Sequence, residues 1–238
     1  MGKVAYILVC WNNKNLLDEC VDSINKQSFK DKSIYLIDNN SSDGSAEYTE
    51  EHYPEIVLVK SNKNNGFAKG NNILIQEAMK DPDVEYFALI NTDARLDKDW
   101  TTELIKVAKQ HPKTASLQGL TLDYFDNAIV DSHHIYVAKN LQATQYGYKQ
   151  SAGQIDYYTR EVLGVNAAAA VITRNFIEEQ PEKQLFDESF FMYLEDVDVA
   201  LRAVVMGWEN YFVSKSIAYH MGSASSNKRS SSFSLYYT

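Results

Sequence analysis

Short apolar runs alternate with amphipathic stretches along the first half of the chain, and this alternation restricts the fold more than any other feature. Runs rich in β-branched and aromatic residues predict buried strands, whereas apolar residues at helical spacing predict helices. Strands that alternate with helices imply right-handed crossovers and an α/β, Rossmann-like, mostly parallel sheet with helices on both faces. The predicted strands are Val4–Cys10, Ser33–Ile37, Ile56–Val59 and Tyr86–Ile90, and the predicted helices are Asn15–Gln27, a segment around Glu47, Phe67–Met79 and Trp100–Ala108.

The second half of the chain has a less regular pattern. Residues 123–154 show no strong helical period, and their Tyr, Val and Ile content predicts a meander or long loops over the sheet. We expect one domain at 1–222, made of a regular half (1–110) and a mixed half (111–222), followed by a Ser-rich tail at 223–238 without regular structure. The elements predicted in the mixed half are the strands Thr114–Leu122, Gly164–Thr173 and Tyr211–Val213, and the helices Asn175–Glu179 and Glu195–Met206.

Charge and cysteine content exclude several classes of protein. A net charge of −9 over 238 residues argues against non-specific nucleic-acid binding, which requires Lys and Arg to displace phosphate counterions. It leaves nucleotide binding open, because a metal ion can supply the positive charge. Cys10 and Cys20 fit no metal spacing and no disulfide framework. No apolar stretch approaches the roughly 20 residues that span a bilayer, so we expect a reduced, soluble, cytoplasmic protein.

The loops that follow the predicted strands are rich in Asn, Asp, Gly and Ser. In a doubly wound sheet the functional loops lie at the carboxyl ends of the strands. Part of this composition is turn chemistry, since these residues also tolerate left-handed backbone and cap helices. The loops that this rule selects are Trp11–Asn13, Asp38–Gly44, Asn62–Gly70 and Asn91–Ala94.

Two strand-end carboxylates are candidates for nucleotide chemistry. Asp38 is placed to accept hydrogen bonds from a base or a ribose, or else it holds its own turn together. Asp93 suits a hard divalent cation that bridges two phosphates, although a helix cap also explains it. Between them, the glycine-containing helix start at 64–71 favours an anion near Lys69, or forms a plain glycine turn.

A third acidic segment lies late in the chain. Glu195, Asp196 and Asp198 follow an apolar run that would bury part of the cluster. Close carboxylates in an apolar setting raise one another's pKa, which suits a general base, although acids at a helix start also act as caps. His220 follows the last predicted strand and is a candidate metal or phosphate ligand, or a structural histidine.

These segments, in this order, resemble the family 2 glycosyltransferases with a GT-A fold, and most closely the rhamnosyltransferase-like branch that builds bacterial surface polysaccharides. The resemblance covers nearly the whole chain and implies an inverting transfer of a sugar from a nucleotide diphosphate to an acceptor hydroxyl. The motifs that carry it are Val9-Cys-Trp-Asn12, Asp38-Asn-Asn-Ser-Ser-Asp-Gly, Asn65-Gly-Phe-Ala-Lys-Gly-Asn71, Asn91-Thr-Asp-Ala and Tyr193-Leu-Glu-Asp-Val-Asp198.

The resemblance also implies a role for individual residues. Asp196 would be the catalytic base, with Glu195 orienting the sugar or the acceptor. Asp93 and His220 would hold Mn²⁺ or Mg²⁺, while Asn91 stands where many relatives carry a further acid. Residues 1–110 would bind the nucleotide and residues 111–222 the acceptor. The implied nucleotide-binding residues are Trp11, Asn12, Asp38, Asn40, Asn65, Gly66, Lys69, Gly70, Asn71, Asn91 and Thr92.

The expected partners follow from the same resemblance. The donor would be a UDP- or dTDP-sugar, and the acceptor a saccharide or a lipid-linked saccharide, which would bring the protein to the inner face of the cell membrane. The donor sugar and the oligomeric state are not indicated. A nucleotidyltransferase is an alternative. It would need a glycine-rich phosphate-binding loop after the first strand, and the loop at that place, Trp11-Asn-Asn-Lys, contains no glycine. A catalytically silent binding domain is a second alternative, which the intact acids argue against.

Overall fold

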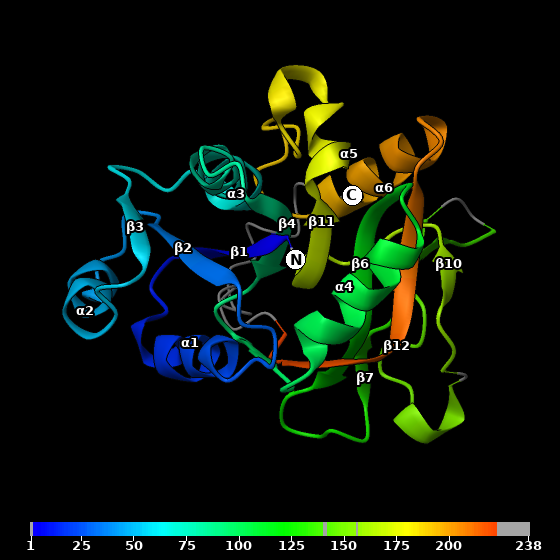
Figure 1. The fold of residues 1–238 in the computed structure, drawn as a ribbon. Helices are drawn as coiled ribbons and strands as arrows, with labels where there is room; N and C mark the ends of the chain where they lie inside the picture. Colours follow the sequence, from blue (N-terminus) through cyan, green and yellow to red (C-terminus); the bar gives the residue numbers. More distant parts are fainter. Residues whose placement is uncertain (1, 140–141, 156, 223–238) are drawn as a thin grey trace.

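The computed structural model describes residues 2–139, 142–155 and 157–222. In this part of the chain the main sheet has the strand order β10-β12-β6-β11-β4-β1-β2-β3, with β5 beside β12 and β7 beside β6 (Figure 1). A separate two-stranded sheet pairs β8 with β9. The strands are β1 (Lys3–Cys10), β2 (Lys32–Asp38), β3 (Val57–Lys60), β4 (Val84–Ile90), β5 (Ala94–Leu96), β6 (Thr114–Asp123), β7 (Val130–Ser132), β8 (Ile135–Val137), β9 (Ala143–Gln145), β10 (Arg160–Val162), β11 (Ala169–Thr173) and β12 (Glu209–His220).

The order of the parallel strands creates a switch point beside β1. The chain runs outward from β1 to β2 and β3, which pair in parallel, and then returns to place β4 on the other side of β1. Loops that leave β1 and β4 therefore turn in opposite directions and open a crevice at the carboxyl ends of these strands. Cys10 pairs with Asp38 at that end of the sheet, so the loops after β1 and β2 begin side by side.

Two apolar layers cover the faces of the sheet. Alternate residues of β1 enter different layers: Tyr6 and Leu8 pack with α1 and α4, whereas Ala5 and Ile7 pack with α3, α5 and α6. Strands buried on both faces read as continuous apolar runs, which is the pattern that β1 and β4 show. The helices are α1 (Leu17–Asn25), α2 (Ser45–His52), α3 (Gly66–Ala78), α4 (Trp100–Gln110), α5 (Arg174–Glu178) and α6 (Glu195–Val205).

The expected α/β architecture is confirmed, and the second half is mixed as predicted. The short strand β11 runs antiparallel between β4 and β6 and begins at Ala169, not at Gly164. Strand β12 extends well beyond the predicted Tyr211–Val213, because it pairs in parallel along most of β6. The three-residue strands β5 and β10, which both pair with β12, were not predicted. The predicted tail at 223–238 lies outside the described residues.

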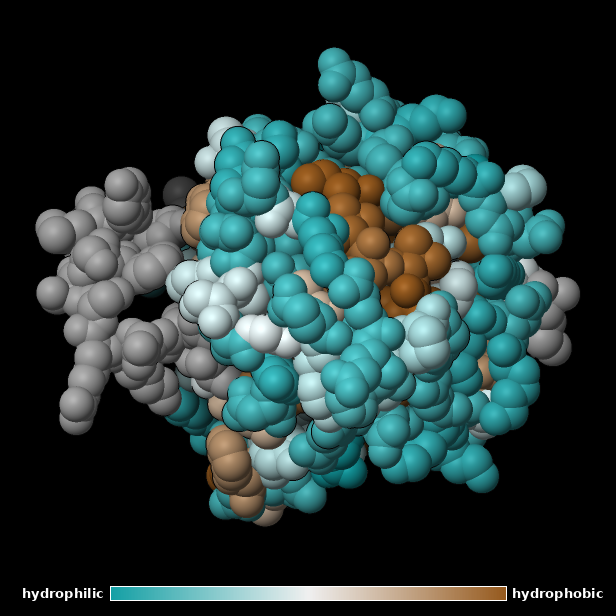
Figure 2. Space-filling view, turned by 90° about the vertical axis from the view of Figure 1, so that its left-hand side faces the viewer, coloured by the Kyte–Doolittle hydropathy of each residue, from teal (hydrophilic) through white to brown (hydrophobic). Residues whose placement is uncertain are grey.

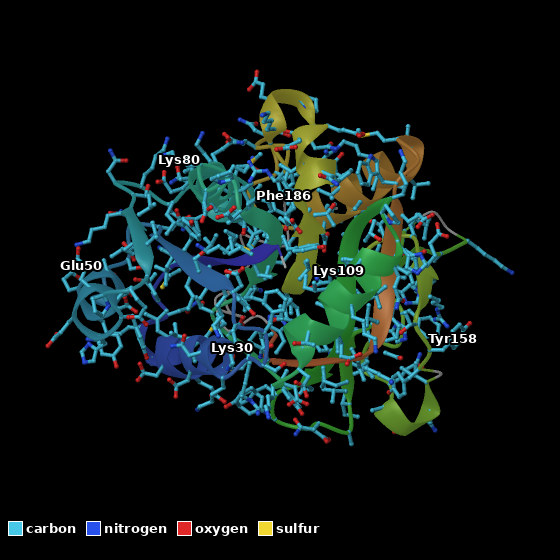
Figure 3. All side chains as sticks on the ribbon, viewed as in Figure 1. Lys30, Glu50, Lys80, Lys109, Tyr158 and Phe186 are labelled. Carbon is cyan, nitrogen blue, oxygen red and sulfur yellow. The ribbon has the colours of Figure 1, made fainter. Side chains whose placement is uncertain are left out.

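The molecular surface is largely hydrophilic. Lys30, Glu50 and Lys80 lie at the surface, whereas Phe186 is buried beside α3, where its ring lies 5.8 Å from that of Phe67 (Figure 3). The side of the molecule that carries β3 shows an apolar patch within a hydrophilic surround (Figure 2), and Val57 on this edge strand is exposed. Among the described residues, no helix combines the length and apolar character that crossing a bilayer requires.

Candidate active site

A pocket of about 330 Å³ opens at the carboxyl ends of β1 and β4, where the sheet order predicts a ligand crevice. Its wall combines residues from both halves of the chain. The first half contributes Val9, Trp11, Asn13, Asn39, Asn64, Gly66, Phe67, Asn91, Thr92 and Asp93. The second half contributes Ile135, Ala143, Thr144, Gln145, Asn166, Ala167, Ala168, Met192, Tyr193, Leu194, Glu195, Asp196, Val197 and His220.

Asp38 is the last residue of β2 and lies beside this pocket. The hydrogen bonding of its two carboxylate oxygens differs. Its Oδ2 accepts a hydrogen bond of 3.1 Å from the backbone N–H of Ser41, which stabilises the turn. The side chain is buried, at 4 % exposure, and within the described part of the chain Oδ1 has no hydrogen-bond partner. Buried polar atoms are nearly always paired, so Oδ1 marks a place where a hydrogen-bond donor is missing, although Asp38 lies behind the pocket wall and not in it. Its chain neighbour Asn39 lines the pocket.

Asn39 fastens the loop before α3 to the end of β2. Its Nδ2 donates to the carbonyl of Gly66 at 3.0 Å, and its Oδ1 accepts from the backbone and side chain of Asn65, each at 3.3 Å. Sequence reasoning selected Asn40 in this turn. Asn40 is exposed in left-handed backbone at φ 65°, so it shapes the turn, and the inward-facing residue is Asn39. Strand β2 ends at Asp38, so alternation along the strand does not extend to Asn39 and Asn40 and gave no signal for choosing between them.

Gly66 permits a close approach between two loops of the pocket. Its φ is 74°, and a Cβ at this position would lie 2.3 Å from the backbone oxygen of Phe191. That oxygen accepts a hydrogen bond of 2.8 Å from the N–H of Phe67. The start of α3 is thereby fixed to the loop that precedes α6, which carries the acidic pair.

The loop after β1 contributes Trp11 and Asn13. Trp11 is 40 % exposed and lines the pocket, as the sequence led us to expect. Asn12 instead turns to the neighbouring loop, where its Oδ1 accepts from the N–H of Ser42 at 2.8 Å. Asn13, which sequence reasoning did not select, is buried and donates to the Thr92 hydroxyl at 2.8 Å. This bond joins the loops after β1 and β4.

Asp93 and His220 are brought together by strand pairing. Ala94 of β5 pairs with His220 of β12, and the imidazole Nε2 lies 3.2 Å from Asp93 Oδ1 and 3.3 Å from Asn91 Nδ2. The other ring nitrogen, Nδ1, lies 2.9 Å from Asp131 Oδ2. Burial by itself would lower the pKa of His220, but the hydrogen bonds and charges of Asp131 and Asp93 raise it to about 10.

The chemistry of this donor set fits a divalent metal ion. A carboxylate oxygen and an imidazole nitrogen are both ligands that Mn²⁺ accepts, and a carboxylate behind the imidazole is the usual support for a metal-binding histidine. No cluster of three or more His, Cys, Asp or Glu side chains suited to a metal occurs among the described residues. A metal ion held by Asp93 and His220 would therefore need further ligands from outside these two side chains.

Glu195 and Asp196 begin α6 and face the same pocket. The two preceding residues, Tyr193 and Leu194, have φ of 75° and 70°, a left-handed turn that aims the helix start at the pocket. Burial, together with the charge of Asp196, raises the pKa of Glu195 to about 7. Burial raises the pKa of Asp196 to about 6, although backbone N–H groups of Val197 and Ala167 oppose this rise.

Other residues selected from the sequence lie outside the pocket wall. Lys69 forms an ion pair of 2.6 Å with Glu188, which neutralises the charge expected to attract a phosphate. Gly70 packs against the side chain of Val9, and Asn71 is buried with its amide donating to the carbonyl of Phe67. These positions lie on the turns of α3 that follow its first residue, where the helix packs on the sheet. The selected residues outside the wall are Asn12, Asp38, Asn40, Asn65, Lys69, Gly70 and Asn71.

A sheet switch point that holds this pocket, with a strand-end acid, an Asp–His pair and a helix-start acidic pair, defines a glycosyltransferase of the GT-A class. Residues 6–175 match the model of the family described as "Glycosyl transferase family 2", and the chain belongs to that family.

Sequence relatives agree with this assignment. The N-acetylglucosaminyl-diphospho-decaprenol L-rhamnosyltransferase of Mycobacterium tuberculosis is 22% identical over 226 residues, which cover 86% of this chain and 71% of that protein. The poly-beta-1,6-N-acetyl-D-glucosamine synthase of Staphylococcus epidermidis is 25% identical over 123 residues. That match covers 49% of this chain and only 28% of the synthase, so the chain corresponds to a part of the larger enzyme.

Solved structures share the fold. GalNAc-T7, solved with UDP, GalNAc and Mn²⁺, superposes with a TM-score of 0.72 at 13% identity, over 92% of this chain and 44% of that one. TarS 1–349 of S. aureus, solved with UDP, gives a TM-score of 0.61 at 15% identity, over 91% of this chain and 60% of that one. The GT-A fold expected from the sequence is thereby confirmed.

Proposed function

We propose that this protein transfers a sugar from a metal-bound UDP- or dTDP-sugar to an acceptor hydroxyl, with inversion at the anomeric carbon. The observation that carries the proposal is that one pocket contains both the Asp93–His220 pair and the Glu195–Asp196 pair. The Asp93–His220 pair suits a metal ion that binds a diphosphate, and the Glu195–Asp196 pair suits removal of a proton. Transfer of a sugar from a diphosphate to a hydroxyl group needs both functions.

The donor nucleotide would bind at the carboxyl ends of β1 and β2. Oδ1 of Asp38, which has no hydrogen-bond partner in the described part of the chain, would accept a hydrogen bond from the base or the ribose, and Trp11 offers an exposed aromatic face to a planar ring. Gly66 lines the same pocket, and its lack of a side chain leaves room for the Phe191 backbone that closes the pocket wall. In this arrangement residues 1–110 supply most of the nucleotide contacts and residues 111–222 the acceptor side.

Asp93 and His220 would hold a divalent cation, Mn²⁺ or Mg²⁺. The bound cation would neutralise the negative charge that develops on the departing diphosphate. Nδ1–H of His220 donates to Asp131, and because the pKa of His220 is raised to about 10, Nε2 would have to lose its proton before it could act as a metal ligand beside Asp93. Asn91 is near enough to His220 to hold the ring in place but contributes no charge.

The chemical step would be a single displacement. The acceptor oxygen forms a bond to the anomeric carbon while the bond from that carbon to the diphosphate oxygen breaks, and the electron pair leaves with the diphosphate. The acceptor proton passes to the carboxylate of Asp196. With a pKa of about 6, Asp196 is mainly ionised at neutral pH, whereas Glu195, at about 7, is half protonated. Both raised pKa values suit proton removal near neutral pH; we assign the base role to Asp196, whose carboxylate accepts the Val197 N–H, and a hydrogen bond with a sugar hydroxyl to Glu195.

The acceptor would approach across β8 and β9. Thr144 lines the pocket, and its cross-strand partner Tyr136 is exposed on the same face of this small sheet. Tyr136 adjoins Tyr146, and the guanidinium of Arg160 lies over the rings of both Tyr146 and Tyr158. Tyr158 lies at the surface (Figure 3). Aromatic faces that carry hydroxyl groups suit a saccharide, free or lipid-linked. The bacterial relatives support a role in surface-polysaccharide synthesis.

The direct test is to supply UDP- and dTDP-sugars with Mn²⁺ and to measure nucleotide diphosphate release with and without saccharide acceptors. We expect release to depend on the acceptor and to fall by at least a hundredfold in Asp196→Asn, because general-base catalysis contributes about 10²–10⁴-fold. Release of pyrophosphate when UTP or dTTP is supplied with a sugar 1-phosphate would instead favour a nucleotidyltransferase. Tight nucleotide-sugar binding without turnover of any of these donors would favour a silent binding domain.

A further inference from the structure

Asn166 lies in the loop between β10 and β11 and contacts the carboxylate of Asp196. Its Nδ2 donates to Asp196 Oδ2 at 3.3 Å, while its Oδ1 accepts the backbone N–H of Ala168 at 3.0 Å. The second bond fixes the orientation of the amide, because a flipped side chain would oppose its NH₂ group to a backbone N–H. Asn166 therefore presents a donor to Asp196.

Gln118 on β6 holds the backbone of Asn166 in place. Its Oε1 accepts the Asn166 N–H at 2.7 Å, and its Nε2 donates to the hydroxyl of Ser132 at 2.7 Å. Gln118 and Ser132 are almost completely buried. Both ends of the glutamine amide are thus paired, and a connected chain of hydrogen bonds runs from β7 through β6 to the start of α6. Buried polar networks in which every member is paired rigidify the groups they join.

The surroundings of Asp196 leave few other groups to stabilise its charge. The N–H of Val197 donates to its other oxygen, Oδ1, at 2.9 Å. Behind it, a small cavity is lined by Leu89, Ile172, Phe186 and Val199 among others, with no charged side chain besides Asp196. On the pocket side the titratable residues of the wall are Tyr193, Glu195 and His220 from the second half of the chain and Asp93 from the first half. Asn166 is thus a neutral side-chain donor that contacts this carboxylate directly.

We propose that Asn166, held by Gln118, is a positioning residue that orients the carboxylate of Asp196 for proton transfer and stabilises its ionised form. The proposal rests on the proposed function, in which Asp196 receives the acceptor proton. Oδ2 is turned by the Asn166 amide and Oδ1 by the Val197 N–H, so the plane of the carboxylate is set before an acceptor arrives. Neither Asn166 nor Gln118 gives or takes the proton itself.

The test measures the titration of Asp196 directly, by ¹³C NMR of its carboxyl carbon in the full chain, without any substrate. Three proteins are compared with wild type: Asn166→Ala, the isosteric Asn166→Asp, and Asn127→Ala, which changes an exposed asparagine far along the chain from the site. We expect Asn166→Ala to raise the pKa of Asp196 by about one pH unit, because a donor to the charged form is lost. Asn166→Asp should raise it further through like-charge repulsion, and Asn127→Ala should leave it unchanged.

An unchanged titration of Asp196 in both Asn166 variants overturns the positioning role, whatever the activity. If Asn166→Ala does not fold, the isosteric Asn166→Asp decides alone, since it keeps the side-chain volume and the acceptor for Ala168. Once a donor is identified, the acidic limb of the kcat/KM profile should move to higher pH in Asn166→Ala. Failure of the proposed function appears separately, as full transfer by Asp196→Asn with the NMR shift still present.

Discussion

The imidazole Nε2 of His220 lies 3.2 Å from Oδ1 of Asp93, so that the end of β12 completes a site begun by the loop after β4. If these atoms share a metal ion, Asp93→Ala and His220→Ala should each weaken Mn²⁺ binding by at least tenfold. Isothermal titration of Mn²⁺ in the presence of UDP measures this. Asp131→Ala should have a smaller effect, since Asp131 contacts the ring and not the ion. Full transferase activity in excess chelator would contradict the metal assignment.

Asp38 should be essential for nucleotide affinity because its buried Oδ1 has no partner among the described residues. Asp38→Asn replaces an acceptor by a donor at one of the two oxygen positions and should weaken UDP or dTDP binding by about tenfold or more, which corresponds to one charge-assisted hydrogen bond. Asp31→Asn is the matched control, because it removes the same charge from an exposed position at the start of β2. Equal thermal shifts with nucleotide in both variants would contradict the role of Asp38.

Glu195 should lower the stability of the folded protein at neutral and alkaline pH. Its pKa rises from 4.5 to about 7, chiefly through burial, so the folded state binds its proton more tightly than the unfolded state does. Stability is therefore lost as pH rises from about 4.5 to about 7. Glu195→Gln should increase the free energy of unfolding by roughly 1–3 kcal/mol at pH 8, and by much less at pH 5. Urea denaturation at the two pH values measures the difference, with the exposed Glu55→Gln as control.

Comparing Gly66→Ala with Gly207→Ala should separate the free-energy cost of a steric clash from the cost of left-handed backbone alone. Both Gly66 and Gly207 have φ near 75°, but a Cβ on Gly207 meets nothing within 4 Å, whereas one on Gly66 would lie 2.3 Å from Phe191 O. Gly207→Ala should cost about 1 kcal/mol from left-handed backbone alone. Gly66→Ala should cost more and also weaken nucleotide binding, since the loop before α6 must move. Equal unfolding free energies for the two variants would show that this contact does not constrain the site.

The exposed tyrosines beside β8 and β9 should contribute to binding of the acceptor and not to binding of the donor. Tyr136→Ala removes an aromatic face next to the pocket and should raise KM for a saccharide acceptor by about tenfold, with KM for the nucleotide sugar unchanged. Phe125→Ala, which truncates a more exposed ring in the turn after β6, is the control. Initial rates measured while each substrate is varied in turn distinguish the two effects. Equal changes in both KM values would contradict an acceptor surface here.

The first half of the fold was predictable from sequence because its strands are buried on both faces. The apolar runs of β1 and β4 and the amphipathic helices between them read directly as a doubly wound sheet. Strands of three residues, such as β5 and β10, carry too few residues to show a period. Their positions depend on pairing with β12, which is a long-range property of the folded chain.

The site was predictable only where strand ends or motifs marked it. Asp93, His220, Glu195 and Asp196 were selected from the sequence, and the structure places all four in one pocket. Asn39 was missed in favour of its neighbour, because the side on which a turn residue points depends on its backbone angles. Asn166 was missed because Gln118 and Asp196, its partners outside its own loop, lie on β6 and α6, and no local pattern signals them.

The antiparallel pairing of Ala94 with His220 also sets an order of events during synthesis. The loops after β1, β2 and β4 consist of early residues, whereas much of the pocket wall belongs to the second half of the chain. The imidazole that faces Asp93 lies at the end of β12, which pairs along most of β6. A nascent chain therefore contains the strand-end loops before it contains the imidazole and the acidic pair, and the pocket wall is complete only once the second half has been added.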